Sequence, residues 1–165
     1  MEATNEEFQI KHLVKQDVVL FQQLIEVFED VFEMKKQEKA KASYLKTMLG
    51  KPEFISYVII HNGIVVGGLT AHELQMYYSE HSEMFIYGIA IKSEYQRKGL
   101  GKKLMEVLEK YCRQNDIKIM FVEANEEDTK AVDFYRQTGA RAEKVVHFIY
   151  ELITDDVVAT ADAAL

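Results

Sequence analysis

The chain has 165 residues and a mass of 19.1 kDa, with 48% hydrophobic residues and one proline, so it is long and apolar enough to bury the core of a single domain. Its net charge of −7 and its pI near 5.3 disfavour a nucleic-acid-binding protein, which would carry a basic face, and favour a cationic partner. No apolar run reaches the roughly 20 residues of a membrane span, so no membrane partner is expected. One cysteine and no metal-ligand spacing indicate a reducing compartment and no metal. We therefore expect a cytoplasmic protein with one domain over residues 1–165 and loose tails at 1–7 and 154–165.

The first third of the chain predicts a short strand followed by two helices. After the start at residues 8–10, apolar residues recur at helical spacing over 20–32 and predict an amphipathic helix. A charged segment follows at 33–41. Residues 44–49 predict a second, short helix that stops at Gly50.

The pattern then changes to the two-residue period of strands. Residues 54–60 and 64–71 are rich in β-forming side chains, and the turn His61-Asn62-Gly63 between them is a strong hairpin signal. Residues 84–91 are apolar almost throughout, which predicts a central strand buried on both faces.

The last third of the chain alternates helices with strands. We predict helices over 99–113 and 128–137, with strands over 117–124 and 144–152. The full order is strand, two helices, three strands, helix, strand, helix, strand. It indicates a mixed α/β domain.

One turn joins the buried strand to the third helix and has the composition of an anion site. Its residues are Gln96, Arg97, Lys98, Gly99, Leu100 and Gly101. Unpaired amides at a helix start attract phosphate, and the basic side chains of the turn and of Lys102 add positive charge. The signatures of Walker loops and dinucleotide folds are both absent. A tight turn without a ligand is the simpler alternative.

This turn resembles the acyl-coenzyme A loop of the GNAT N-acetyltransferase superfamily. Over residues 18–151 the chain is more specifically similar to the aminoglycoside 3-N-acetyltransferases. The segments that carry this similarity are 43–45, 65–69, 83–91, 96–104, 131–139 and 146–148. The resemblance implies a GNAT fold with a twisted mixed sheet of about six to seven strands and about four helices. It also implies that acetyl-CoA enters a V-shaped opening between the fourth and fifth strands, and that the protein is a homodimer.

The resemblance also implies a set of residues for acetyl-CoA. Backbone amides at Ile89, Ala90 and Ile91 would bind the thioester and the pantetheine arm and stabilise the developing oxyanion. The turn, Lys102 and Asn125 would bind the rest of the cofactor. Tyr135 matches the general acid of the family, although helical spacing alone makes it a core aromatic.

An acidic cluster near the end of the fifth strand is the predicted acceptor site. Its members are Glu123, Glu126, Glu127 and Asp128, and Tyr87 would line the same cleft. We expect the cluster to bind cationic amines and Glu123 to accept a proton as the general base. The alternative is a solvated acidic turn that favours the following helix N-terminus. The family carries an aspartate at the position of Gly88, and this chain departs from that pattern.

The sequence thus favours an acetyl-CoA-dependent N-acetyltransferase that acts by direct attack of an aminoglycoside amine, the chemistry behind one form of antibiotic resistance. Two alternatives stay open. One is a GNAT acetyltransferase for a polyamine, a small metabolite or a protein amine. The other is a non-catalytic sensor that binds acyl-CoA.

Overall fold

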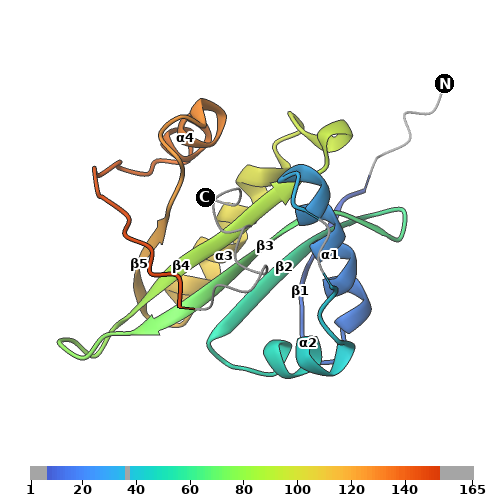
Figure 1. Cartoon of the computed structure of the whole chain (residues 1–165), viewed down its shortest axis with the longest axis horizontal. Helices are drawn as coiled ribbons and strands as arrows, with labels where there is room; N and C mark the ends of the chain where they lie inside the picture. The colour runs from blue at the N-terminus through green and yellow to red at the C-terminus, as the bar shows by residue number, and fades with distance from the viewer. Residues whose placement is uncertain (1–6, 36–37, 153–165) are drawn as a thin grey trace.

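A computed structural model describes residues 7–35 and 38–152 as a mixed five-stranded sheet with helices on both faces (Figure 1). The strands lie in the order β1-β2-β3-β4-β5. The strands are β1 (Gln9–His12), β2 (Phe54–His61), β3 (Ile64–Gln75), β4 (Ser82–Ile91) and β5 (Ile117–Val122). The helices are α1 (Val18–Val31), α2 (Ala42–Leu49), α3 (Leu100–Gln114) and α4 (Thr129–Gln137), with a short 3₁₀ turn at Ser93–Tyr95. The mixed α/β class, the four helices and the order of elements up to α4 are as predicted.

The β2–β3 hairpin has the turn that the sequence predicts. Asn62 and Gly63 both have positive φ, at 50° and 78°, as a two-residue turn with the twist of the strands requires. His61 pairs with Ile64 across the turn, and the antiparallel register continues to Phe54 and His72.

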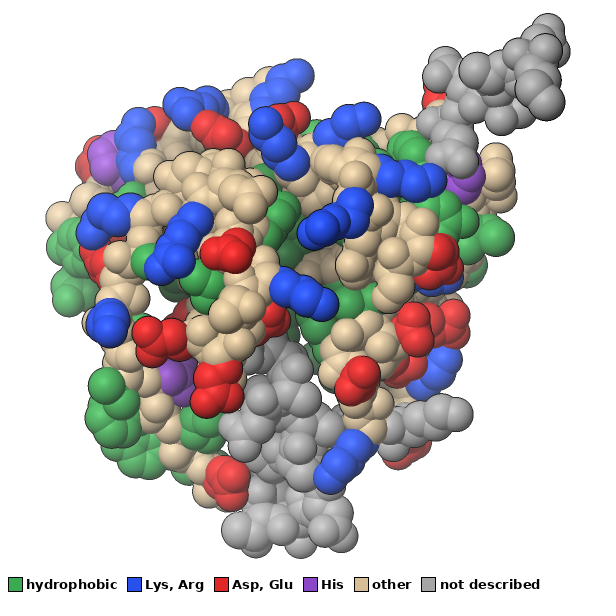
Figure 2. Space-filling model, turned by 90° about the horizontal axis from the view of Figure 1, so that it is seen from above, with side chains coloured by type: hydrophobic (Ala, Val, Ile, Leu, Met, Phe, Trp, Pro, Cys, Tyr) green, Lys and Arg blue, Asp and Glu red, His purple; other side chains and the backbone are tan. Residues whose placement is uncertain are grey.

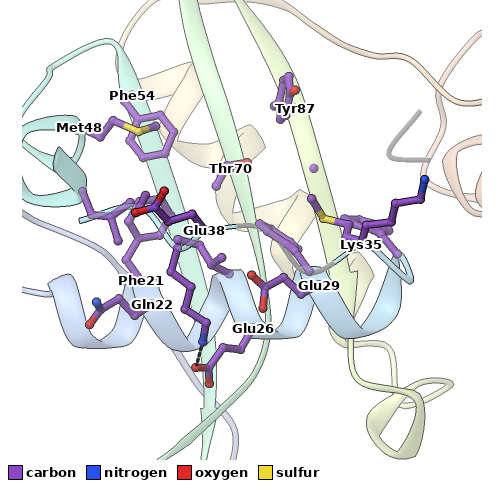
Figure 3. Close-up of a pocket in the computed structure, with 18 of the residues that line it drawn as sticks. Phe21, Gln22, Glu26, Glu29, Lys35, Glu38, Met48, Phe54, Thr70 and Tyr87 are labelled. Carbon is purple, nitrogen blue, oxygen red and sulfur yellow. Dashed lines mark hydrogen bonds and ion pairs between the residues drawn. The ribbon is translucent and has the colours of Figure 1, made fainter. Parts of the chain in front are cut away.

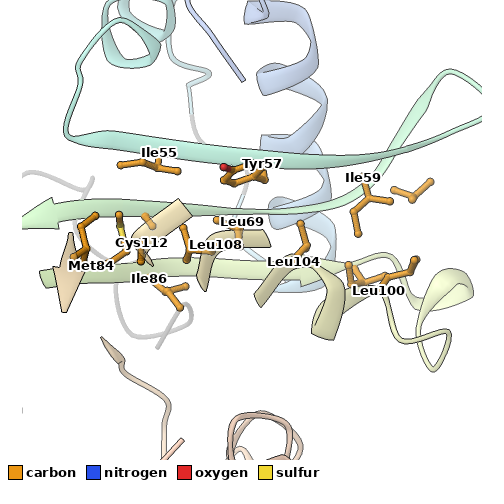
Figure 4. Close-up of a cluster of buried hydrophobic side chains, with 14 residues drawn as sticks. Ile55, Tyr57, Ile59, Leu69, Met84, Ile86, Leu100, Leu104, Leu108 and Cys112 are labelled. Atoms are coloured by element: carbon orange, nitrogen blue, oxygen red, sulfur yellow. The ribbon is translucent and has the colours of Figure 1, made fainter. Parts of the chain in front are cut away.

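The side chains of the sheet form two cores, because alternate strand residues point to opposite faces. On one face, Leu100, Leu104 and Leu108 of α3 pack on Tyr57 and Leu69 (Figure 4). On the other face, α1 and α2 cover the sheet. The buried residues of this second core are Leu13, Phe21, Leu24, Val27, Leu45, Leu49, Phe54, Val58, Val65 and Ala90.

Two glycines in β3 let α1 and β4 come close to that strand. A Cβ on Gly68 would lie 2.4 Å from the carbonyl oxygen of Tyr57 and 2.7 Å from Cδ1 of Leu24. A Cβ on Gly67 would lie 2.5 Å from Cδ1 of Ile91. Both positions therefore admit only glycine without movement of the backbone or of α1.

β4 and β5 pair over only half the length of β4. The two strands run parallel from Ser82 and Ile117 to a last pair at Ile86 and Val122, while β4 continues to Ile91. At the same point β4 has a bulge against β3, where the register shifts between Ala71 and Thr70. The second half of β4 therefore pairs with no described strand on the side of β5.

Two strand predictions are wrong. β4 is not buried on both faces, because Tyr87 is 57% exposed and Phe85, Gly88 and Ile89 are only partly buried. Residues 144–152 form no strand, so the described sheet has five strands rather than six or seven. They have the apolar composition of a strand, but they are exposed and pair with no described strand. The predicted tails lie outside the described residues, except for residue 7.

Within the described residues, no helix combines the length and the apolar composition that crossing a bilayer requires.

Candidate active site

The turn at residues 96–101 has the backbone geometry of an anion cradle. Arg97 and Gly99 both have positive φ, at 63° and 76°, so the chain doubles back before α3 begins. Gly99 is the N-cap of α3, and no side chain caps the helix there. The side chain of Gln96 donates to the carbonyl oxygen of Ile91 at 2.9 Å and ties the turn to the end of β4. Within the described residues, no side chain caps these first amides of α3, and unpaired amides at a helix start attract anions.

Positive charge surrounds this turn although the whole chain is acidic. Arg97, Lys98 and Lys102 are exposed, and Lys98 lies 5.7 Å from the ring centres of both Phe8 and Tyr95. Seen from above, Lys and Arg side chains are spread over the upper part of the molecule with fewer acidic ones between them (Figure 2). This surface suits a ligand with several phosphates.

Gly101 connects the turn to α4. A Cβ at this position would lie 3.1 and 3.2 Å from two ring atoms of Phe134. The ring of Phe134 in turn meets that of Tyr135 edge-on at 5.2 Å. The glycine therefore allows α4 to lean on the start of α3, and this contact fixes the helix that carries Tyr135.

Tyr135 is partly buried, and its hydroxyl stays protonated at neutral pH. Burial, and to a smaller extent the charge of Asp128, raise the pKa of Tyr135 to about 12. A phenol with this pKa can donate a proton, but it cannot serve as a base at neutral pH.

The free half of β4 offers backbone groups for an extended ligand. Ile89, Ala90 and Ile91 pair with β3 on one side and lie beyond the last pair with β5 on the other. This is the V-shaped opening between the fourth and fifth strands that the resemblance implies. An extended pantetheine-like chain could pair there as a strand does.

A large cavity opens beside the bulge, between α1, the segment that follows it, α2 and the sheet (Figure 3). Its volume is about 890 Å³. Tyr87 and Gly88 of β4 and Thr70 and His72 of β3 form the sheet side of its wall. The other wall is mostly apolar and aromatic, with Phe28 and Phe32 stacked at 5.6 Å.

Three carboxylates stand around this cavity. Glu26 and Glu29 come from α1, and Glu38 from the segment after it (Figure 3). Glu26 accepts a hydrogen bond from Lys39 at 2.8 Å, which raises the pKa of that lysine. The sequence missed this wall, because a polar helix face ordinarily meets solvent. The charged segment after α1 was the available signal.

The members of the predicted acidic cluster each contact a different partner. Glu123 lies 3.2 Å from His147, and Glu126 lies 3.8 Å from Lys144. The carboxylate of Asp128 accepts from the amide of Ala131 at 3.0 Å as the N-cap of α4, which is the structural role that the sequence left open. Glu127 is exposed, and its amide donates to the side chain of Asn125 at 3.1 Å. Of the predicted acceptor residues, only Tyr87 lines the cavity.

Comparisons with known proteins agree with this fold. The model of the acetyltransferase (GNAT) family matches residues 21–140. An aminoglycoside acetyltransferase, meta-AAC0020 from an uncultured soil metagenomic sample, solved in complex with sisomicin, is 37% identical; the match covers 88% of this chain and 97% of that one, with a TM-score of 0.86. A second, HMB0005, also from an uncultured soil metagenomic sample, is 28% identical over 89% of this chain and 99% of that one, with a TM-score of 0.85.

A more distant structure agrees in fold alone. Aminoglycoside N-acetyltransferase AAC(6')-Iy in complex with CoA is 14% identical over 93% of this chain and 100% of that one, with a TM-score of 0.77. Among curated proteins, no relative matches. The family match spans most of the chain. The chain therefore belongs to the GNAT acetyltransferase family, whose cofactor is acetyl-CoA.

Proposed function

We propose that this protein transfers an acetyl group from acetyl-CoA to an amino group of an aminoglycoside by direct attack of the amine. The observation that carries the proposal is the cavity of about 890 Å³, which meets β4 at Tyr87 and Gly88, where β5 leaves the sheet. An acceptor in the cavity thus lies next to the opening in which the donor would bind. The 37% identical neighbour that was solved with sisomicin supports this acceptor class.

The residues that the sequence predicts for acetyl-CoA binding suit the chemistry of this cofactor. The positive φ of Gly99 and the close approach of Phe134 to Gly101 leave the turn with bare backbone at the start of α3. We propose that residues 96–102 and Asn125 hold the phosphates and the neighbouring part of the cofactor, and that Ile89, Ala90 and Ile91 hold its extended arm. When bound, acetyl-CoA supplies the acetyl group as an activated thioester.

The acceptor side fits a cationic sugar. Aromatic rings give flat apolar surface to a sugar ring, and carboxylates at the rim attract ammonium groups. Glu29 and Glu38 supply this charge, while Glu26 is paired with Lys39, and Tyr87 borders the reacting end. Glu123, Glu126, Glu127 and Asp128, on the other side of the opening, would add to the negative field.

We assign to Tyr135 the role of general acid. Its hydroxyl is protonated at neutral pH because its pKa is raised to about 12, and α4 holds it near the turn through Phe134 and Gly101. It would give its proton to the leaving sulfur, which needs no prior ionisation of the tyrosine.

Thiol release from acetyl-CoA tests the proposal. Sisomicin and gentamicin-type aminoglycosides are set beside polyamines and peptide amines, and we expect turnover with the aminoglycosides. Mapping the product by NMR then decides between the 3-amine that the sequence resemblance implies and another position. If no aminoglycoside is turned over but another amine is, the proposed acceptor class is wrong and the assignment as an acetyltransferase stands.

A second acceptor class has one observation in its favour. Gly88 leaves the cavity without a side chain at the reacting end, where the aminoglycoside 3-N-acetyltransferases carry an aspartate. A smaller or differently charged amine, such as a polyamine, would then be the substrate, and the same assay distinguishes it. Tight acetyl-CoA binding without turnover of any amine would instead indicate a sensor.

A further inference from the structure

We propose that His72 is the general base of this enzyme, and that its imidazole takes the proton from the ammonium group of the acceptor. The inference rests on the proposed function, because it assumes that the acceptor occupies the cavity beside Tyr87 and Gly88. It assigns to a residue of β3 the role that the sequence gave to Glu123.

The position of His72 follows from the register of the sheet. Its partners are Phe54 on β2 and Phe85 on β4, two steps along β3 from the Thr70–Gly88 pair. Because side chains alternate along a strand, Thr70 and His72 share a face, and both line the cavity. An acceptor that reaches the donor past Gly88 therefore passes His72.

Aromatic contacts fix the imidazole ring at this wall. The ring of Phe54 lies 5.2 Å from it at an angle of 56°, and the ring of Tyr87 lies 6.1 Å away, nearly perpendicular at 81°. Within residues 7–35 and 38–152, no group hydrogen-bonds to its ring nitrogens, so a lone pair stays available for the substrate. Glu123, by contrast, has a polar partner, because it lies 3.2 Å from His147, and it is not part of the cavity wall.

Partial burial favours the neutral form of His72, and the carboxylates of the cavity wall attract the cation. Partial burial lowers the pKa of His72 below its usual 6.5; the charge of Glu53 opposes this shift, and that of Lys51 adds to it. The ionisable groups on the cavity wall are Tyr87 of β4, Glu26 and Glu29 of α1, and Lys35, Glu38 and Lys39 of the segment before α2. A neutral imidazole at pH 7 can accept a proton, and the carboxylates attract the ammonium group that brings it.

The step balances without any further reactant. One N–H bond of the ammonium breaks, its electron pair stays on nitrogen, and a new N–H bond forms on the imidazole. The products are a free amine with a nucleophilic lone pair and an imidazolium ion, which later releases its proton to solvent.

Rates as a function of pH test the assignment with His72→Gln, which keeps a polar side chain of similar size. We expect a loss of about 10²-fold or more in kcat/KM at neutral pH, since general bases contribute on this scale. The remaining activity should rise about tenfold per pH unit up to the pKa of the acceptor amine, because only amine that is already free reacts. The matched control is His81→Gln, in the β3–β4 loop, which should leave the profile unchanged. Unchanged thermal unfolding and acetyl-CoA binding show that His72→Gln folds.

A measurement without turnover gives an independent answer. The imidazole signal of His72, assigned with the His72→Gln variant, is titrated by NMR with and without sisomicin. A bound polycation next to the ring should lower its pKa further. The proposal is overturned if His72→Gln keeps the activity and pH profile of the wild type while Glu123→Gln loses them, or if sisomicin binds and the titration of His72 does not change. Failure of the wild type to acetylate any amine would count against the proposed function instead, and the titration would then decide the placement of His72.

Discussion

The role that we propose for Tyr135 depends on its keeping its proton. Because its pKa is raised to about 12, it stays a donor across the whole range in which the enzyme would work. The Tyr135→Phe variant keeps the ring and its contact with Phe134, and removes only the hydroxyl. We expect kcat to fall by about 10²-fold with little change in KM for acetyl-CoA. Steady-state kinetics check this, and an unchanged kcat would exclude Tyr135 as the acid.

The turn proposed to bind the cofactor requires glycine at both position 99 and position 101, but for different physical reasons. Gly99 has open space around it and a φ of 76°, so Gly99→Ala costs backbone strain of about 1 kcal/mol. Gly101 has no positive φ, but a Cβ there meets Phe134 at 3.1 Å. We expect Gly101→Ala to displace α4, raise KM for acetyl-CoA several-fold and reduce kcat through Tyr135. Thermal unfolding of the two variants measures the backbone strain expected in Gly99→Ala, and their kinetics measure the displacement of α4 expected in Gly101→Ala. Equal kinetic effects would contradict this distinction.

At the level of elements, α4 depends on one capping residue. Asp128 accepts the amide of Ala131 at 3.0 Å, and no residue of α4 is fully buried. Loss of an N-cap costs about 1 kcal/mol, and this helix has little packing with which to compensate. We therefore expect Asp128→Ala to fray α4 and lower kcat. Asp128→Ser can still cap the helix, so it should keep most of the helicity and most of kcat. Circular dichroism and kinetics measure the two effects, and equal loss in both variants would argue for a direct role of the carboxylate in binding the acceptor.

The elements themselves could be predicted from the sequence wherever a local pattern determines them. The helix of residues 20–32 and the turn at Asn62-Gly63 are confirmed by α1 and by the hairpin, since side-chain period and backbone preference are local properties. The strand at 144–152 is wrong, because a strand also needs a partner edge, which its own composition does not reveal.

The proposed cofactor site could be predicted from the sequence and the cavity could not, because only the first is determined by a local pattern. The cofactor turn is one continuous motif, whereas the cavity joins α1, its following segment, α2, β3 and β4. His72 and Glu29 are 43 residues apart and carry no shared pattern. Only the folded chain places them on one wall.

At the scale of the whole molecule, two partly desolvated histidines link stability to pH. Partial desolvation of their rings lowers the pKa of both His12 and His72 below the 6.5 that they have in the unfolded chain. The unfolded chain therefore binds more protons below about pH 6.5, and the free energy of unfolding should fall as the pH decreases from about 7 to about 5. Denaturant titrations at several pH values measure the slope. His12→Phe, which keeps a ring stacked on Tyr57, should reduce it, and an unchanged slope would contradict the assignment.

The homodimer stays a prediction, and exposed apolar side chains support it. Val146, Phe148 and Tyr150 are each at least 75% exposed, and Ile119 and Phe121 are exposed on β5, the last strand of the described sheet. Contiguous exposed apolar surface commonly marks an interface. We expect the full chain to sediment as a dimer and the variant Phe148→Asp/Tyr150→Asp to sediment as a monomer. A wild type that sediments as a monomer at all concentrations would contradict this.

The early end of the pairing between β4 and β5 also bears on the order of events in a catalytic cycle. Beyond the last β4–β5 pair at Ile86 and Val122, the helix with Tyr135 meets the start of α3 where Phe134 approaches Gly101. A donor that fills this gap would tie the two parts together, and the free energy of its binding would stabilise α4. The acid would then reach its working position only after the donor has bound. Such an enzyme would follow an ordered kinetic mechanism in which acetyl-CoA enters first and coenzyme A leaves last.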